Sequence, residues 1–214
     1  MEHKEDNVVY RLFDDGTASV TAVDKFAKSI TIKSKVQSHK VTRIDFMACS
    51  RAINLIKVSI PSSVCEIGAN AFAFCENLVH VYIDAKLITL RKGAFSYCKN
   101  LQSIIAYDVK VEENVFKNCY DLWELRCTFV GTLKRRTMES CRNLQRLTCG
   151  DNITMEDDIF FDCQELKSII FEGNAKLDNT LLTELANKNV KIICAKYTSN
   201  LMDLAYSGMN VVCY

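Results

Sequence analysis

Cysteine is the residue type of this chain that could most readily do chemistry, because its thiolate binds metals and attacks electrophiles. The chain has 11 cysteines and 3 histidines. No cysteine is spaced from another cysteine or from a histidine as in Cys-x-x-Cys or Cys-x-x-His, so the usual zinc and redox spacings are absent from the sequence. His3, His39 and His80 are isolated, with no cysteine or acidic partner at a metal or catalytic spacing. We therefore predict no catalytic residue, no metal site, no cofactor and no enzymatic activity.

Five of the cysteines recur at intervals of 23, 21, 22 and 22 residues. Each lies in the motif Phe-x-x-Cys-x-(Asn/Asp/Glu)-Leu-x-x-aliphatic, and Met138 replaces the phenylalanine in one copy. A period of roughly 20 to 29 residues with leucines at this spacing is typical of a leucine-rich-repeat solenoid. The five are Cys75, Cys98, Cys119, Cys141 and Cys163.

These periodic cysteines are expected to be buried and reduced. Free cysteine is among the residue types most often found inside proteins, where it packs as a small apolar side chain. Stacked turns nevertheless place equivalent residues about 4.8 Å apart, which is within the Cα separation of a disulfide. Bridging under oxidation is therefore the open alternative, for example between Cys75 and Cys98 or between Cys127 and Cys149.

The repeats divide a single domain, residues 1–214, into three parts. Regular turns occupy residues 41–172. Residues 1–40 are predicted to form a β-rich N-terminal cap and a degenerate turn, because Asp14-Asp15-Gly16 between two apolar runs is typical of a hairpin. Residues 173–214 are predicted to form an α/β C-terminal cap that hides the end of the core. Its expected elements are a helix starting at Asp178-Asn179-Thr180, a strand over Val190–Cys194, a helix over Thr198–Tyr206 and a strand over Asn210–Val212.

Alternation along each strand predicts which side chains face outward. The positions three and five residues after each motif leucine are expected to point inward, and the positions two, four and six residues after it to point outward. The outward set combines aromatic, apolar and charged groups, as interface hot spots do, although isolated exposed apolar residues are also normal. The predicted partner-binding residues are His80, Tyr82, Ile105, Tyr107, Glu124, Arg126, Arg146 and Thr148.

The run from Ile60 to Leu78, Ile-Pro-Ser-Ser-Val-x-x-Ile-Gly-x-x-Ala-Phe-x-x-Cys-x-Asn-Leu, resembles the BspA-type leucine-rich repeat. Gly93–Leu101 repeats its second half, and Asp15–Thr21 and Val190–Val212 are similar to segments common around such repeats. The resemblance covers nearly the whole chain and is specific, because five copies are in phase. It implies an α/β repeat solenoid, a leucine-rich-repeat horseshoe with a parallel sheet on its concave face. It also implies binding to proteins or surfaces, since family members are often surface adhesins.

Charge and hydropathy argue against binding to nucleic acid and against insertion into a membrane. The net charge is +1, so the composition has no bias toward nucleic acid or an anionic membrane. The basic run Lys134-Arg135-Arg136 lies one turn before the acidic run Glu156-Asp157-Asp158, and the two are predicted to pair with each other. Residues 1–10 lack the apolar run of a signal peptide, and no stretch approaches the ~18 apolar residues of a spanning helix.

We therefore predict a non-catalytic, monomeric recognition scaffold that binds a protein partner on its concave sheet face. Neither nucleic acid nor membrane insertion is expected. The predicted location is the cytoplasm, with surface exposure by an unconventional route as the alternative. The alternative function is a structural or adhesive module, either adhesin-like or self-assembling.

Overall fold

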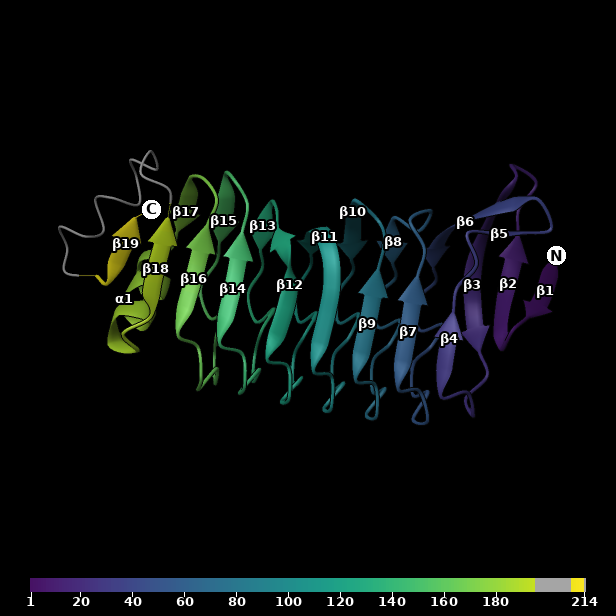
Figure 1. Ribbon diagram of the computed structural model, residues 1–214, viewed down its shortest axis with the longest axis horizontal. Helices are drawn as coiled ribbons and strands as arrows, with labels where there is room; N and C mark the ends of the chain where they lie inside the picture. Colours follow the sequence, from purple (N-terminus) through teal and green to yellow (C-terminus); the bar gives the residue numbers. More distant parts are fainter. Residues whose placement is uncertain (195–208, 214) are drawn as a thin grey trace.

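The computed structural model is a β-solenoid whose parallel coils stack along one long axis (Figure 1). It describes residues 1–194 and 209–213. Each regular coil contributes one strand to a parallel ladder, here called the front ladder. The strands of the front ladder are β4 (Ser29–Thr31), β7 (Lys57–Ile60), β9 (His80–Ile83), β11 (Ser103–Val111), β12 (Glu124–Phe129), β14 (Arg146–Cys149), β16 (Ser168–Phe171), β18 (Lys191–Cys194) and β19 (Val211–Cys213).

The motif spacing predicts one strand per turn, whereas the structure has further parallel strands behind the front ladder (Figure 1). Long β11 belongs to both layers, because it pairs with β9 at Ile105 and with β10 at Asp108. Most of the back strands span only two to four residues, too few for a period of two to stand out in the sequence. They are β3 (Thr17–Val23), β6 (His39–Ile44), β8 (Glu66–Ile67), β10 (Leu87–Leu90), β13 (Thr132–Leu133), β15 (Ile153–Met155) and β17 (Ala175–Leu177).

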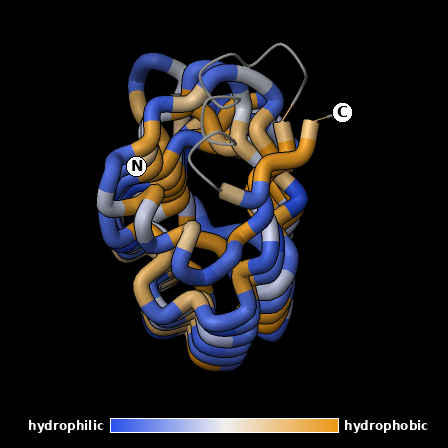
Figure 2. Tube along the Cα trace, turned by 90° about the vertical axis from the view of Figure 1, so that its left-hand side faces the viewer, coloured by the Kyte–Doolittle hydropathy of each residue, from blue (hydrophilic) through white to orange (hydrophobic). Residues whose placement is uncertain are grey.

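The core is a set of columns in which the same motif position is buried in every coil. Seen along the stack, successive coils overlie one another (Figure 2). The rings of Phe72 and Phe95 are parallel with centroids 5.2 Å apart, and those of Phe95 and Phe116 follow at 6.0 Å. Met138 and Phe160 continue this buried column. A single coil cannot bury these side chains alone, so each coil depends on its neighbours.

The periodic cysteines are buried, as predicted, and each also makes a hydrogen bond between coils. Every one of the five thiols donates to the main-chain carbonyl of the residue at the phenylalanine position one coil earlier. The Sγ–O distances are 3.0 to 3.1 Å. The pairs are Cys75 with Cys49, Cys98 with Phe72, Cys119 with Phe95, Cys141 with Phe116, and Cys163 with Met138.

The N-terminal end is an antiparallel sheet. The predicted hairpin is present as β2 (Val8–Leu12) and β3. A strand that the motif reading does not predict, β1 (Glu2–Glu5), pairs with β2 through a turn in which Asp6 and Asn7 both have positive φ. The short strand β5 (Lys35–Val36) folds back on β6 in the same way.

At the C-terminal end, helix α1 (Asn179–Asn187) follows the last regular coil. The Asp178 side chain accepts a hydrogen bond from the Thr180 N–H, and Leu181 and Leu185 are buried, as the sequence predicts. The helix expected over Thr198–Tyr206 lies outside the described residues. No helix within residues 1–194 and 209–213 has the length and apolarity to cross a bilayer.

The stacked phenylalanine column predicts that truncating Phe72 destabilises the protein much more than truncating the nearby Phe74. Phe72 is fully buried, whereas Phe74 is 37% exposed and stacks on Tyr97 at the surface. Phe72→Ala should lower the free energy of unfolding by about 3 to 5 kcal/mol because it leaves a cavity. Phe74→Ala should cost no more than ~1.5 kcal/mol. Urea denaturation of both variants measures this, and equal losses would contradict the assignment of the column.

The burial of the thiols predicts their order of reaction. Cys65 is exposed, Cys213 is partly exposed and the other nine cysteines are buried. With a thiol reagent, native protein should show one fast thiol, which Cys65→Ser removes, while the buried thiols react only on unfolding. Denatured protein prepared without reductant should give 11 thiols. Mass evidence of a stable bridge, for example between Cys75 and Cys98, would overturn this prediction.

The same burial predicts a loss of stability at alkaline pH. Desolvation raises the pKa of the Cys127 and Cys163 thiols from 9.0 to about 12. The contribution of the two thiols to the free energy of unfolding is complete below pH 9. It is lost between about pH 9 and 12, because the unfolded chain releases protons that the folded chain retains. Each thiol should lower the free energy of unfolding by about 1.4 kcal/mol per pH unit in that window. Denaturation curves of Cys127→Ala should show a shallower decline, and an unchanged slope would contradict the prediction.

Candidate recognition surface on the front ladder

The front ladder arranges outward side chains in rows across adjacent strands. Tyr82 on β9 is in register with Ile105 on β11, which is in register with Arg126 on β12. A parallel row two residues earlier contains His80 and Glu124. The structure thus brings these five predicted residues together on three neighbouring strands.

The exposure of these side chains decides what a partner could touch. The Arg126 side chain is 66% exposed and Tyr82 is 37% exposed. Ile105 is half-buried between them. Tyr107 is 61% exposed and lies on the same strand as Ile105, β11, so the four anchors come from three strands.

Two serines predicted to face outward are buried. The Ser103 Oγ lies 2.9 Å from the His80 Nδ1, and this contact covers it. Ser168 is buried in a row between Arg146 and Lys191, because long side chains flank a short one. The outward rows are therefore less polar at the surface than the alternation predicts.

Strand β11 bulges next to Tyr107. The pairing with β12 shifts by one residue between Ile105 and Asp108. Ala106, which the alternation predicts to be buried, is only partly buried at this irregularity. A bulge redirects side chains and increases local twist. Tyr107, which the alternation already predicts to face outward, is exposed beside this irregularity.

The front ladder is interrupted between β12 and β14. Regular stacking predicts that Glu124 and Arg126 lie beside Arg146 and Thr148. Among the described residues, however, the two strands pair only near their C-terminal ends, through Phe129. The neighbouring strands β14 and β16 form four pairs. The predicted rows are thus broken here, because β12 lies out of register with β14.

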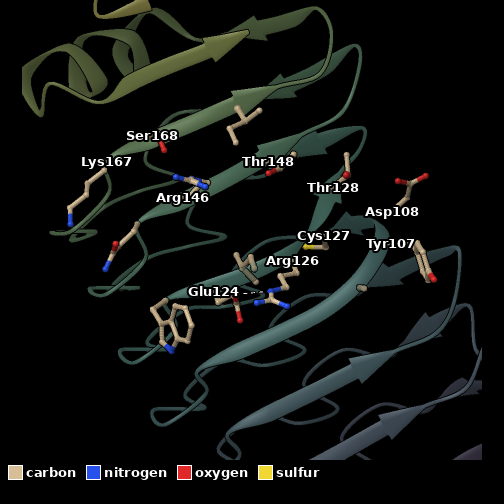
Figure 3. A pocket seen from close by; sticks show the side chains of 15 residues that line it. Tyr107, Asp108, Glu124, Arg126, Cys127, Thr128, Arg146, Thr148, Lys167 and Ser168 are labelled. Atoms are coloured by element: carbon tan, nitrogen blue, oxygen red, sulfur yellow. Dashed lines mark hydrogen bonds and ion pairs between the residues drawn. The ribbon is translucent and has the colours of Figure 1, made fainter. Parts of the chain in front are cut away.

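A hollow of about 660 Å³ lies where the two strands part. Figure 3 shows Glu124 and Arg126 reaching into it from β12, and Arg146 from β14. Lys167 and Trp123 also line it. Neither Lys167 nor Trp123 is among the binding residues predicted from the sequence. They occupy the position directly after a motif leucine, which is exposed in most coils, and this was the available signal.

The charges around this hollow are unevenly neutralised. Arg126 Nε lies 2.7 Å from Glu124 Oε1. Lys167 Nζ is 3.9 Å from a Glu165 oxygen. Arg146 is exposed and makes no ion pair within the described part of the chain. The hollow therefore presents one unpaired guanidinium beside two cations that are at least partly paired.

A second hollow of about 510 Å³ adjoins the first at Tyr107. Apolar groups dominate its wall, among them Ile32, Pro61, Tyr82 and Ile105. It lies over β4, β7, β9 and β11, toward the N-terminal end of the stack. The front face thus combines an apolar hollow and a cationic hollow side by side.

Charges elsewhere on the coils are paired between neighbours. Lys134 Nζ lies 3.2 Å from Glu156, and Arg135 lies 2.7 Å from Asp158. The predicted pairing of the basic and acidic runs is confirmed. Arg91 bridges two acidic residues in the same manner. These cations are already engaged with carboxylates, unlike Arg146.

No group of three or more histidine, cysteine, aspartate or glutamate side chains among residues 1–194 and 209–213 could hold a metal ion. His39 Nδ1 lies 2.8 Å from a main-chain carbonyl and His80 contacts Ser103. The arrangement offers surface and shape for binding, and we identify no nucleophile with an adjacent base in it.

Comparisons with known proteins agree with this architecture. The model of the BspA type leucine rich repeat region matches residues 22–129 and 108–207, with six copies. A comparison with functionally curated proteins found no match.

Several solved structures share the fold. A leucine rich repeat protein of T. pallidum is 20% identical, with a TM-score of 0.62 over 90% of this chain and 98% of that one. A leucine-rich repeat protein of Bacteroides capillosus is 24% identical, with a TM-score of 0.51 over 59% of this chain and 97% of that one. A third, from Bacteroides ovatus, is 15% identical, with a TM-score of 0.51 over 91% and 79%. At these identities the likeness concerns the fold alone.

Proposed function

The chain belongs to the BspA type leucine rich repeat family, and from this premise we propose that it is a non-catalytic recognition scaffold that binds a protein partner on its front face. The observation that carries the proposal is the row of Tyr82, Ile105 and Arg126 in register on three strands, with Tyr107 beside it. Aromatic and arginine side chains on a rigid support are the groups that contribute most to protein interfaces.

We further propose the finer architecture that this function needs. Residues 1–214 form one curved domain with the front ladder on its concave side. Residues 1–40 and 173–214 cap the stack. The antiparallel β1–β3 sheet at one end and helix α1 at the other support this assignment. Solenoid ends need such covers because the last coil otherwise exposes its core.

A structural or adhesive role is the second candidate, and exposed apolar residues away from the recognition surface favour it. Phe26 is 85% exposed, Phe46 is 65% exposed and Phe161 is 59% exposed. In a self-assembling module these side chains would pack between copies. Light scattering on a dilution series separates the candidates: a monomer at all concentrations supports recognition, and a concentration-dependent oligomer supports assembly.

The recognition proposal predicts the effect of truncating two anchors. Once proximity labelling in the native cell has identified a partner, Tyr82→Ala with Arg126→Ala should weaken its binding more than tenfold, because each anchor contributes more than ~2 kcal/mol. The melting temperature should hardly change, since both side chains are exposed. Calorimetric titration measures the affinity.

Lys134→Ala with Arg135→Ala is the matched control on the outer edge of the coils. It removes two cations that pair with carboxylates of the next coil, and it should leave partner binding nearly unchanged. Should this control abolish binding while the front-face variant does not, the recognition surface lies elsewhere and the proposal is wrong.

A further inference from the structure

We propose that the partner presents an extended acidic segment, which inserts an apolar side chain into the hollow at Tyr82 and a carboxylate into the hollow at Arg146. This inference rests on the proposed function and specifies the chemistry of the ligand. Three features of the front face carry it: the break in the ladder, the unpaired charge, and the adjacency of the two hollows.

The break in the ladder leaves a main-chain donor free at the cationic hollow. In the other coils the first residue of the front strand donates its N–H to the preceding coil: Ser103 to Val79 at 3.3 Å, and Ser168 to Gln145 at 3.2 Å. Arg146, the equivalent residue of β14, makes no such bond within the described part of the chain. Its N–H can donate to a carbonyl or carboxylate of a ligand that enters the gap.

The charge at this place favours a carboxylate. Arg146 contributes a planar guanidinium without an acidic partner, and such a group binds a carboxylate through two parallel hydrogen bonds. Lys167 lies in the neighbouring row of the same hollow. Solvent-exposed ion pairs usually contribute little, but a carboxylate held in a hollow by a charged group and a main-chain N–H is partly desolvated and binds more strongly.

The charges that line the same hollow argue against a densely charged polyanion as the ligand. Glu124 and Asp108 line it together with the cations, and their carboxylates would repel a phosphate backbone. A nucleic acid or an anionic lipid surface needs a broad, continuous cationic face. A peptide that carries one or two acids between uncharged residues fits the mixed charge better.

The positions of the hollows set the spacing within the ligand. Tyr82 on β9 and Arg146 on β14 are three strands apart, which is at least about 14 Å at ~4.8 Å per paired strand, because β12 and β14 part beside Arg146. An extended chain advances about 3.4 Å per residue, so the apolar residue and the acid should be separated by at least roughly four residues. Tyr107, which lines both hollows, would contact the residues between them.

Peptide display on the full-length protein tests this inference. A library of random 12-residue peptides selected on the immobilised protein should become enriched in an apolar residue and an acid at least about four positions apart. For the best selected peptide, Arg146→Ala should weaken binding at least tenfold and Arg146→Lys should restore part of it. Replacing the acid of the peptide by its amide should have the same effect as Arg146→Ala.

The chain provides a matched control and an internal reporter. Arg142 is an exposed arginine of the same coil whose Nε already lies 2.9 Å from Asp162, and Arg142→Ala should leave peptide binding unchanged. Trp123 is the only tryptophan of the chain and lines the cationic hollow. Its fluorescence should change when the peptide binds to the wild type or to Arg142→Ala, and not when it is added to Arg146→Ala at the same concentration.

The outcomes separate this inference from the recognition proposal. Selected peptides that need Tyr82 but tolerate both Arg146→Ala and loss of their acid would overturn the inference and leave the front face as the binding surface. Absence of any enrichment, or preferential binding of single-stranded DNA or anionic vesicles that depends on Arg146, would also overturn it. The recognition proposal is tested separately and fails if the native partner ignores Tyr82→Ala with Arg126→Ala.

Discussion

The stacking of equivalent residues in successive coils is the interaction on which the rest of the structure depends. Phe95 packs between Phe72 and Phe116. The cysteine three residues after each phenylalanine donates its thiol hydrogen bond to a carbonyl of the preceding coil. Each coil therefore obtains both its apolar contacts and its polar partners from its neighbours, as expected for a one-dimensional stack. Since these contacts repeat, the side chains on the outer surface are fixed in rows as well.

The candidate site arises where this regularity fails. Strand β11 bulges beside the exposed Tyr107, and the shifted register of β12 opens the ladder in front of β14. Regular coils pair their main-chain groups with one another and leave little for a ligand to bind beyond side chains. The irregular coils provide a hollow, a free N–H and an unpaired guanidinium at the same place. Local departures from regular geometry often accompany functional sites for this reason.

Charge pairing distinguishes the two sides of the coils. On the outer edge, Arg91 and Arg135 are held by carboxylates of adjacent coils, so those cations contribute to stacking. On the front face Arg146 has no such carboxylate within the described residues. The difference cannot be read from composition, because the same residue types occur on both sides. It depends on which coil places an acid opposite each base.

The sequence by itself determined the period, the buried columns and the parallel order of the front strands, because one motif repeated in phase constrains every coil in the same way. It also predicted the hairpin around Asp14-Asp15-Gly16 and the helix after Asp178, where local capping and turn chemistry suffice. Only the tertiary structure decided the back strands, the burial of Ser103, the partial exposure of Ala106 and the gap beside Arg146. Register and pairing are properties of two neighbouring coils together, and a shift of one residue changes them without changing the motif from which the repeat is recognised.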